Sequence, residues 1–210
     1  MVKKILLFGP PEAGKTTLRR FIFEGIPPGK LVDEPELPTI GMSYNRYGYV
    51  HYYPFYKPGK NPEKVPLNLI VFDSSGQEIN RWLNESKESV FEETDLLLFI
   101  FDISEWMVPD KRANIKDLWL KVSEVRNDLS PDSRFCILGH KIDLLGQKYS
   151  GKSNQKKLAE KIKNELKNAF SEGGNGTIEF EMYLTSIFKH YLNETFYTIL
   201  AIIMDEISPL

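Results

Sequence analysis

The sequence predicts an α/β fold with a mainly parallel sheet, and three observations carry that prediction. Apolar runs of strand length alternate with segments of helical periodicity along the chain. A glycine-containing turn separates the first apolar run from the first helical segment. A later apolar run, residues 69–72, ends in Asp73. Since neighbouring parallel strands need a crossover, usually a helix, this alternation favours βαβ units.

Six strands and five helices follow from these patterns. We expect strands at residues 3–8, 42–53, 67–73, 95–102, 134–139 and 177–184. We expect helices on both faces of the sheet, at residues 15–24, 78–91, 110–129, 153–170 and 187–206. The second and third strands have no helix between them, so they should form an antiparallel hairpin. The stretches 25–38 and 54–66 are rich in proline and glycine and should be loops.

Composition limits the class of protein. The chain has 210 residues, of which 41% are apolar, and a single cysteine, Cys136. Disorder and a disulfide scaffold are therefore excluded, and a reducing, cytoplasmic compartment is expected. The formal charge is −2, which provides no long-range attraction to nucleic acid. No apolar run approaches the roughly 18 residues of a spanning helix. We expect one domain over residues 1–210 that reaches membranes only through partners.

The turn between the first strand and the first helix carries a phosphate-binding motif. Residues 9–16 read GPPEAGKT, which fits G-x-x-x-x-G-K-[ST]. Glycines let the backbone wrap phosphates, and the amides face them beside the positive end of the helix. Lys15 would reach the β- and γ-phosphates, and the Thr16 hydroxyl would ligate Mg²⁺. The Glu12 carboxylate should point to solvent, since it would repel a polyphosphate. Nucleotide contacts are expected from Gly9, Glu12, Ala13, Gly14, Lys15, Thr16 and Thr17.

The third strand ends in a second motif, D-x-x-G-Q at residues 73–77. An acid at the carboxyl end of a strand beside such a loop can hold Mg²⁺, so Asp73 is a candidate metal ligand. The Gly76 amide can approach the γ-phosphate because no side chain blocks it. Gln77 stands where an amide could orient an attacking water. Taken alone, this stretch would be a polar turn that caps the next helix through Ser74 or Ser75.

A third motif predicts guanine specificity. The buried-strand pattern 135–139 ends in His140-Lys141-Ile142-Asp143. The Asp143 carboxylate can accept hydrogen bonds from N1–H and the exocyclic amine of guanine, which adenine does not offer. An unpaired buried acceptor makes discrimination on the order of 10⁴ reasonable. The stem of Lys141 would lie along the base. The stretch Thr185-Ser186-Ile187 could offer an amide to the guanine carbonyl, which makes Ser186 and Ile187 candidates.

Together these motifs resemble the Ras superfamily of small GTPases, with a P-loop NTPase G domain over essentially the whole chain. The resemblance is strongest to the Rag/Gtr GTPases, which carry His where His140 stands in the base motif. It implies a GTP/GDP switch with slow, Mg²⁺-dependent hydrolysis. It also implies that Thr39 is the switch-one threonine and a metal ligand, and that Gln77 and Lys15 are catalytic. Exchange factors, activating proteins, effectors and a homodimer or heterodimer are the partners it implies.

Some features resemble other branches of the superfamily. Pro38-Thr39-Ile40-Gly41 is similar to the Arf and Rab families, and Gly9-Pro10-Pro11 is similar to the MglA-like polarity GTPases. The chain ends after the last expected helix, so the dimer-forming second domain of Rag proteins is not expected here.

Two functions of other classes remain open from the sequence. A nucleotide-stabilised interaction module would hydrolyse GTP negligibly, and a small-molecule P-loop kinase would prefer ATP. Seven of the thirteen residues 44–56 are Tyr or Phe, which fits either cross-strand packing or a partner surface. The lysine-rich helix 153–170 fits a solvated face better than attraction to an anionic membrane.

Overall fold

The computed structural model describes residues 2–33, 41–52, 64–74, 78–174, 176–188 and 190–207. Its centre is a six-stranded sheet in the order β2-β3-β1-β4-β5-β6. The strands are β1 Val2–Phe8, β2 Met42–Tyr52, β3 Lys64–Ser74, β4 Leu96–Asp102, β5 Arg134–His140 and β6 Glu181–Leu184. Every neighbouring pair is parallel except β2 and β3, which form the expected antiparallel hairpin. The predicted mixed α/β sheet is confirmed.

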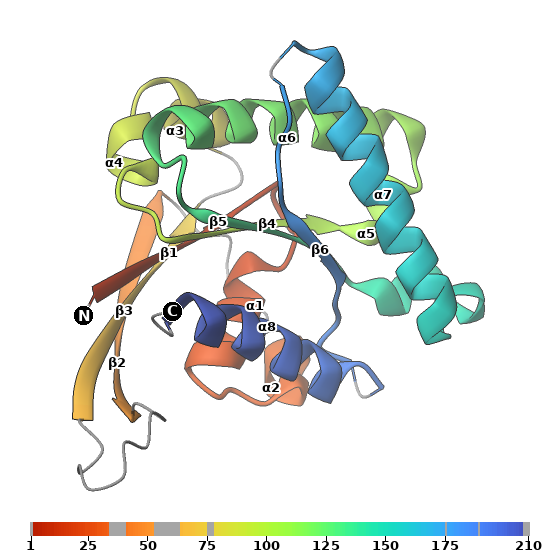
Figure 1. Ribbon diagram of the computed structural model, residues 1–210. Helices are drawn as coiled ribbons and strands as arrows, with labels where there is room; N and C mark the ends of the chain where they lie inside the picture. The colour runs from red at the N-terminus through yellow and green to blue at the C-terminus, as the bar shows by residue number, and fades with distance from the viewer. Residues whose placement is uncertain are drawn as a thin grey trace, which may run out of the picture.

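Helices cover both faces of the sheet. In Figure 1, α3, α4, α6 and α7 lie on one face, and α1, α2 and α8 lie on the other. The α-helical bounds are α1 Lys15–Phe23, α2 Pro28–Asp33, α3 Ile79–Asn84, α4 Lys87–Phe91, α5 Ile103–Trp106, α6 Pro109–Leu129, α7 Lys152–Glu172 and α8 Leu192–Ile207. Two short 3₁₀ turns, η2 Ile142–Leu145 and η3 Gln147–Tyr149, connect β5 to α7. Among these helices, none is long and apolar enough to cross a membrane.

The predicted loop 25–38 contains a short helix that the sequence pattern did not reveal. Helix α2 begins at Pro28, and proline suits a first helical position because its missing N–H would have no partner there. Residues 34–38 lie outside the described part of the chain, as do residues 54–63 of the second predicted loop.

Other boundaries also differ from the prediction, including the start of β3, which lies at Lys64 within the predicted loop 54–66. The single helix predicted at 78–91 is broken into α3 and α4, with Glu85 as the C-cap of the first and Ser86 as the N-cap of the second, a position that serine favours. Strand β6 begins at Glu181 rather than residue 177, because its ladder starts where Cys136 of β5 provides a partner. The final helix begins at Leu192 rather than residue 187, because the preceding residues form a loop at the site.

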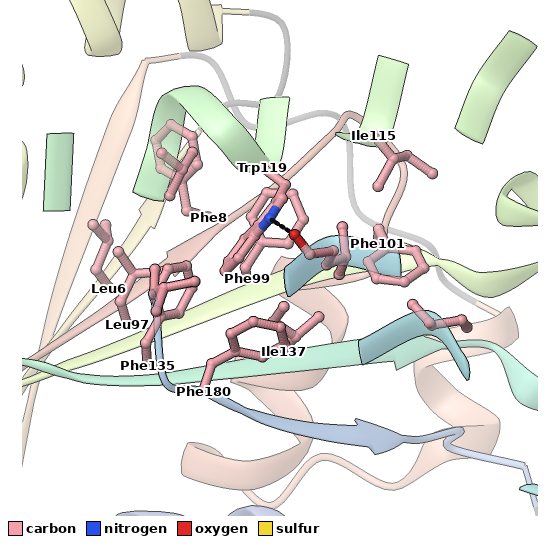
Figure 2. Packing of buried hydrophobic residues seen from close by; sticks show 14 of the residues in the cluster. Leu6, Phe8, Leu97, Phe99, Phe101, Ile115, Trp119, Phe135, Ile137 and Phe180 are labelled. Atoms are coloured by element: carbon pink, nitrogen blue, oxygen red, sulfur yellow. Dashed lines mark hydrogen bonds between the residues drawn. The ribbon is translucent and has the colours of Figure 1, made fainter. Parts of the chain in front are cut away.

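The core consists of two layers separated by the sheet. Alternate residues of β1 and β4 enter opposite layers, as expected for strands buried on both faces. Figure 2 shows the layer under α6, where Phe99, Phe135 and Phe180 surround Trp119. The Trp119 indole N–H donates to the carbonyl of Leu166 on α7 at 3.4 Å, which satisfies its buried polar atom. The opposite layer, under α1 and α8, is mostly aliphatic.

The parallel strands bring the sequence motifs to one edge. The carboxyl ends of β1, β3, β4, β5 and β6 lead into the glycine turn, Asp73, Asp102, His140 and the 185–187 loop, respectively. Ligands of open α/β sheets bind at this edge. The candidate site therefore lies there.

Candidate functional site

The glycine turn 9–16 has a backbone that its glycines make possible. Gly9 has φ +147°, and a Cβ there would overlap the Ile100 carbonyl oxygen of β4. Gly14 has φ +93° and immediately precedes α1. Glu12 also has a positive φ, of 59°, and its side chain is exposed, as predicted. The turn is thus a close-fitting loop at a helix N-terminus, which is the arrangement that binds phosphate.

Lys15 lies under this loop. Its side chain is buried, and its ammonium donates to the carbonyls of Gly9 at 2.8 Å and Pro10 at 2.7 Å. Burial lowers the pKa of Lys15 from 10.5 to about 8, although the negative charge of Asp73 opposes that shift. Because two neutral carbonyls only partly replace the water that a lysine loses on burial, the ammonium is well placed to bind an anion in the loop.

His140 packs directly against the turn. A Cβ on Gly14 would lie 2.6 Å from Cδ2 of the buried imidazole, so only glycine allows this approach. The Nδ1 atom of His140 is 3.0 Å from Thr185 Oγ1. Burial, with help from the charge of Lys141, lowers the pKa of His140 from 6.5 to about 4. The neutral ring therefore joins the phosphate loop to the loop after β6.

Lys141 joins the phosphate loop to the carboxyl end of β4. It has φ +62°, and its ammonium donates to the Glu12 carbonyl at 2.7 Å and to Asp102 Oδ2 at 2.9 Å. Asp102 caps α5 by accepting from the Ser104 amide at 2.8 Å. Burial raises the pKa of Asp102, but hydrogen bonds from Ser104 and Lys141 outweigh it and bring the pKa below its usual value. The position of the Lys141 ammonium is thus fixed by the Asp102 carboxylate and by the backbone of the glycine turn.

Asp143 is also held in place. Its Oδ1 atom accepts a hydrogen bond from the Ser186 hydroxyl. That hydroxyl accepts from the Phe188 amide at 3.0 Å, and the Ser186 amide donates to Thr195 Oγ1 at 3.0 Å. Two carboxylate oxygens have more than one acceptor position each, so this carboxylate retains acceptor capacity for a ligand.

Asp73 presents a different environment. The residue is fully buried, and neither carboxylate oxygen receives a hydrogen bond from the residues that the structure describes. Its nearest cationic partner is Arg19 of α1, whose Nε lies 3.5 Å from Oδ2. A buried carboxylate without hydrogen bonds is costly, and hard divalent cations prefer oxygen ligands. The side chain therefore fits a Mg²⁺ ligand.

The structure brings most of the predicted site residues together. The glycine turn, Lys15, Asp73, the His140–Asp143 segment and the 185–187 loop all converge at the carboxyl edge of the sheet. Thr16 and Thr17 occupy the first turn of α1. Thr39, Gly76 and Gln77 lie outside the described residues, so their predicted roles remain predictions.

Three polar residues that support the site were not predicted from the sequence. They are Asp102, which anchors Lys141; Thr195, which fixes the loop after β6; and Arg19, which faces Asp73. A signal existed for Asp102, which ends an apolar strand and is followed two residues later by Ser104, a capping pattern. Arg19 carried no such signal, because an arginine on a helix is usually a surface residue.

Comparison with known proteins identifies the family. The model of the Gtr1/RagA G protein conserved region matches residues 59–210, which include Asp73 and the base motif. The chain is also similar to the Ras-related GTP-binding protein A of Dictyostelium discoideum, with 27% identity over 150 residues. That alignment covers 69% of this chain and 42% of the relative, so the chain spans less than half of the relative's length. With its α/β sheet and the site described above, this chain belongs to the Gtr1/RagA G protein family.

Proposed function

We propose that this protein is a guanine-nucleotide switch that binds GTP and GDP with Mg²⁺ and hydrolyses GTP slowly. The observation that carries the proposal is the convergence of the glycine turn and the Asp143 carboxylate on one edge of the sheet, joined by His140 and Lys141. The family membership and the GTP-binding relative support the same conclusion.

The phosphate end would bind the polyphosphate. The amides of residues 12–17 and the Lys15 ammonium would bind the phosphates, and Lys15 would exchange its two carbonyl partners for phosphate oxygens. Asp73, with the hydroxyls of Thr16 and Thr39, would hold the Mg²⁺ ion. When bound, this ion supplies positive charge that offsets charge developing on the transferred phosphoryl group.

The base end would select guanine. Asp143 would accept hydrogen bonds from the base edge while its Oδ1 atom keeps the hydrogen bond from the Ser186 hydroxyl. The stem of Lys141 would lie along the base. The amide of Ser186 already donates to Thr195, so of the two candidate amides in this loop, that of Ile187 is the better donor to the guanine carbonyl.

The switch and catalytic roles rest on the sequence motifs. Thr39 and Gly76 would hold the switch segments on the γ-phosphate, and these segments would be released after cleavage. The conformation of the switch segments would thus depend on the bound nucleotide. Gln77 would orient the attacking water. Activating and exchange proteins are the partners that such a switch requires, because intrinsic rates of this chemistry are slow.

Nucleotide competition tests the binding half of this proposal. Excess GTP or GDP should displace fluorescent GDP from the purified protein, and excess ATP should not. Displacement by ATP at comparable concentrations would overturn the guanine assignment in favour of the kinase alternative.

Single-turnover hydrolysis tests the catalytic half. Gln77→Leu should slow GTP cleavage at least about tenfold without weakening GTP binding, and the surface variant Gln147→Leu should match the wild type. Equal rates in all three proteins would overturn the hydrolytic role and leave a nucleotide-stabilised interaction module.

A further inference from the structure

Arg19 is a buried arginine that the proposed reaction does not use. It lies in the first half of α1, on the side that faces β3 and β2, and only 8% of its surface is exposed. Arginine is permanently charged, so burial requires partners. Its partners are Asp73, Glu24 and Tyr47, from three different segments of the fold.

The guanidinium is hydrogen-bonded at Nη1 but makes only a longer ion pair at Nε. Nη1 donates to the Glu24 carboxylate and, at 2.9 Å, to the Tyr47 hydroxyl. That hydroxyl in turn donates to Glu24 Oε1 at 3.0 Å, which closes a three-membered ring of hydrogen bonds. By contrast, Nε is 3.5 Å from Asp73 Oδ2 and makes no hydrogen bond to the residues that the structure describes. Arg19 therefore supplies Asp73 with charge but with no hydrogen bond.

Asp73 has one negative charge to share. Among the described residues, it is balanced by Arg19 at 3.5 Å and, at longer range, by Lys15. A divalent cation at Asp73 would add two positive charges near a guanidinium that is anchored on its other side and cannot swing to solvent. Since like charges in a partly dry site repel strongly, Arg19 and the cation compete for the same carboxylate.

We propose that Arg19 is a built-in competitor of the divalent cation: it neutralises Asp73 in the metal-free state and thereby weakens the affinity of the site for Mg²⁺. Tyr47, on β2, sets the strength of this competition by accepting a hydrogen bond from the guanidinium. Strand β2 begins just after the proposed switch threonine Thr39. The inference rests on the proposed nucleotide function, since it assigns a role toward the cation of that site.

The chain offers a matched set of variants. Arg19→Met removes the charge and keeps the length of the side chain. Arg20→Met removes the neighbouring cation, which also pairs with Glu24, at 3.7 Å, and so controls for the loss of charge and of that partner. Tyr47→Phe removes one hydroxyl only, because the ring stays stacked on Phe23 with centroids 5.1 Å apart. Arg19→Lys keeps the charge and is a second control, and Tyr47→Phe provides the second test if Arg19→Met does not fold.

The measurement is the release rate of fluorescent GDP as a function of MgCl₂ concentration. Mg²⁺ slows release in the wild type if the nucleotide proposal is correct. In Arg19→Met the half-effective Mg²⁺ concentration should fall by about three- to tenfold, as expected for removing one nearby like charge. Tyr47→Phe should shift it in the same direction by less, and Arg19→Lys and Arg20→Met should stay near the wild type.

Thermal unfolding of the nucleotide-free proteins in EDTA provides a second readout. Arg19→Met should melt below Arg20→Met, because it leaves Asp73 buried without a counter-charge. Adding Asp73→Asn to Arg19→Met should restore part of that loss.

The failures can be told apart. If Mg²⁺ does not slow GDP release from the wild type, the proposed cation site fails. If it does, but Arg19→Met needs more Mg²⁺ or responds like Arg20→Met, the proposed competition is wrong and Arg19 either orients Asp73 for the cation or has no influence on it.

Discussion

At the base end of the site every central polar side chain has a hydrogen-bond partner, whereas at the metal end the Asp73 carboxylate has none among the described residues. Asp143 is held by Ser186, His140 by Thr185, and Lys141 by Asp102 and the Glu12 carbonyl. Within the described part of the chain, the nearest ion pair of Asp73 is with the guanidinium of Arg19, at 3.5 Å. If the proposed roles hold, the base pocket is preassembled, whereas Asp73 is costly to bury until a cation binds it.

Removing the carboxylate that we propose contacts the base, Asp143, is the largest expected perturbation. Asp143→Asn should weaken GDP binding at least about a hundredfold, because the amide presents a donor to the donor edge of guanine. Ser186→Ala, which keeps the carboxylate and removes its anchor, should cost about tenfold or less. Titration with fluorescent GDP measures both. Equal losses of GDP affinity in the two variants would show that the Ser186 hydroxyl matters as much as the Asp143 carboxylate, and would contradict a pocket centred on Asp143.

The contact between the two ends can be broken at Gly14. Gly14→Ala would need a left-handed backbone and would place a methyl group 2.6 Å from the buried ring of His140. Gly25→Ala also needs a positive φ, of 64°, but meets no atom within 4 Å. The control should lose about 1–2 kcal/mol of unfolding free energy from backbone strain alone. Gly14→Ala should lose at least about 1 kcal/mol more from the clash. Urea denaturation of the nucleotide-free proteins compares them, and equal losses would contradict the close packing of His140 on the turn.

The buried imidazole predicts an acid limit to stability. The pKa of His140 is about 4 in the folded protein, against 6.5 for an unperturbed histidine. The unfolded chain therefore binds more protons between these values, and stability contributed by the neutral ring is lost as pH falls from 6.5 toward 4. The loss should be a few kcal/mol. Urea midpoints measured from pH 7 to pH 4 should fall less steeply for His140→Asn than for the wild type. Parallel pH profiles would exclude His140 as the titrating group.

A smaller effect is expected at the phosphate end at alkaline pH. The pKa of Lys15 is lowered to about 8 in the ligand-free protein, so the ammonium is lost there above that pH. Binding of inorganic tripolyphosphate should weaken by a few fold between pH 7 and pH 9, because the site must regain a proton to bind the anion. The same depressed pKa means that the unfolded chain holds more protons between pH 8 and 10.5, so this residue makes stability rise with pH in that range. A flat binding profile in isothermal titration calorimetry would show that Lys15 stays charged.

The sequence predicted the motif residues of both ends of the site but not the side chains that support them. The motif residues Lys15, Asp73 and Asp143, the sheet that positions them and the antiparallel hairpin all follow from local pattern and spacing. The supporting partners Asp102, Thr195 and Arg19 do not, because their roles depend on which distant segments the fold brings together. The late start of α8 has the same origin, since Ser186 of the preceding loop is hydrogen-bonded to Asp143 and Thr195. The break between α3 and α4 is local, at Glu85 and Ser86.

One consequence of the core concerns how this protein can be observed. All three tryptophans of the chain, Trp82, Trp106 and Trp119, belong to the layer on the α3 and α6 side of the sheet. Indole emission therefore reports on that side alone and is blind to rearrangement under α1 and α8. Trp82 lies on α3, a few residues after Gln77. In a variant with both Trp106→Phe and Trp119→Phe, all tryptophan emission would come from Trp82 and would report on the neighbourhood of the predicted second switch.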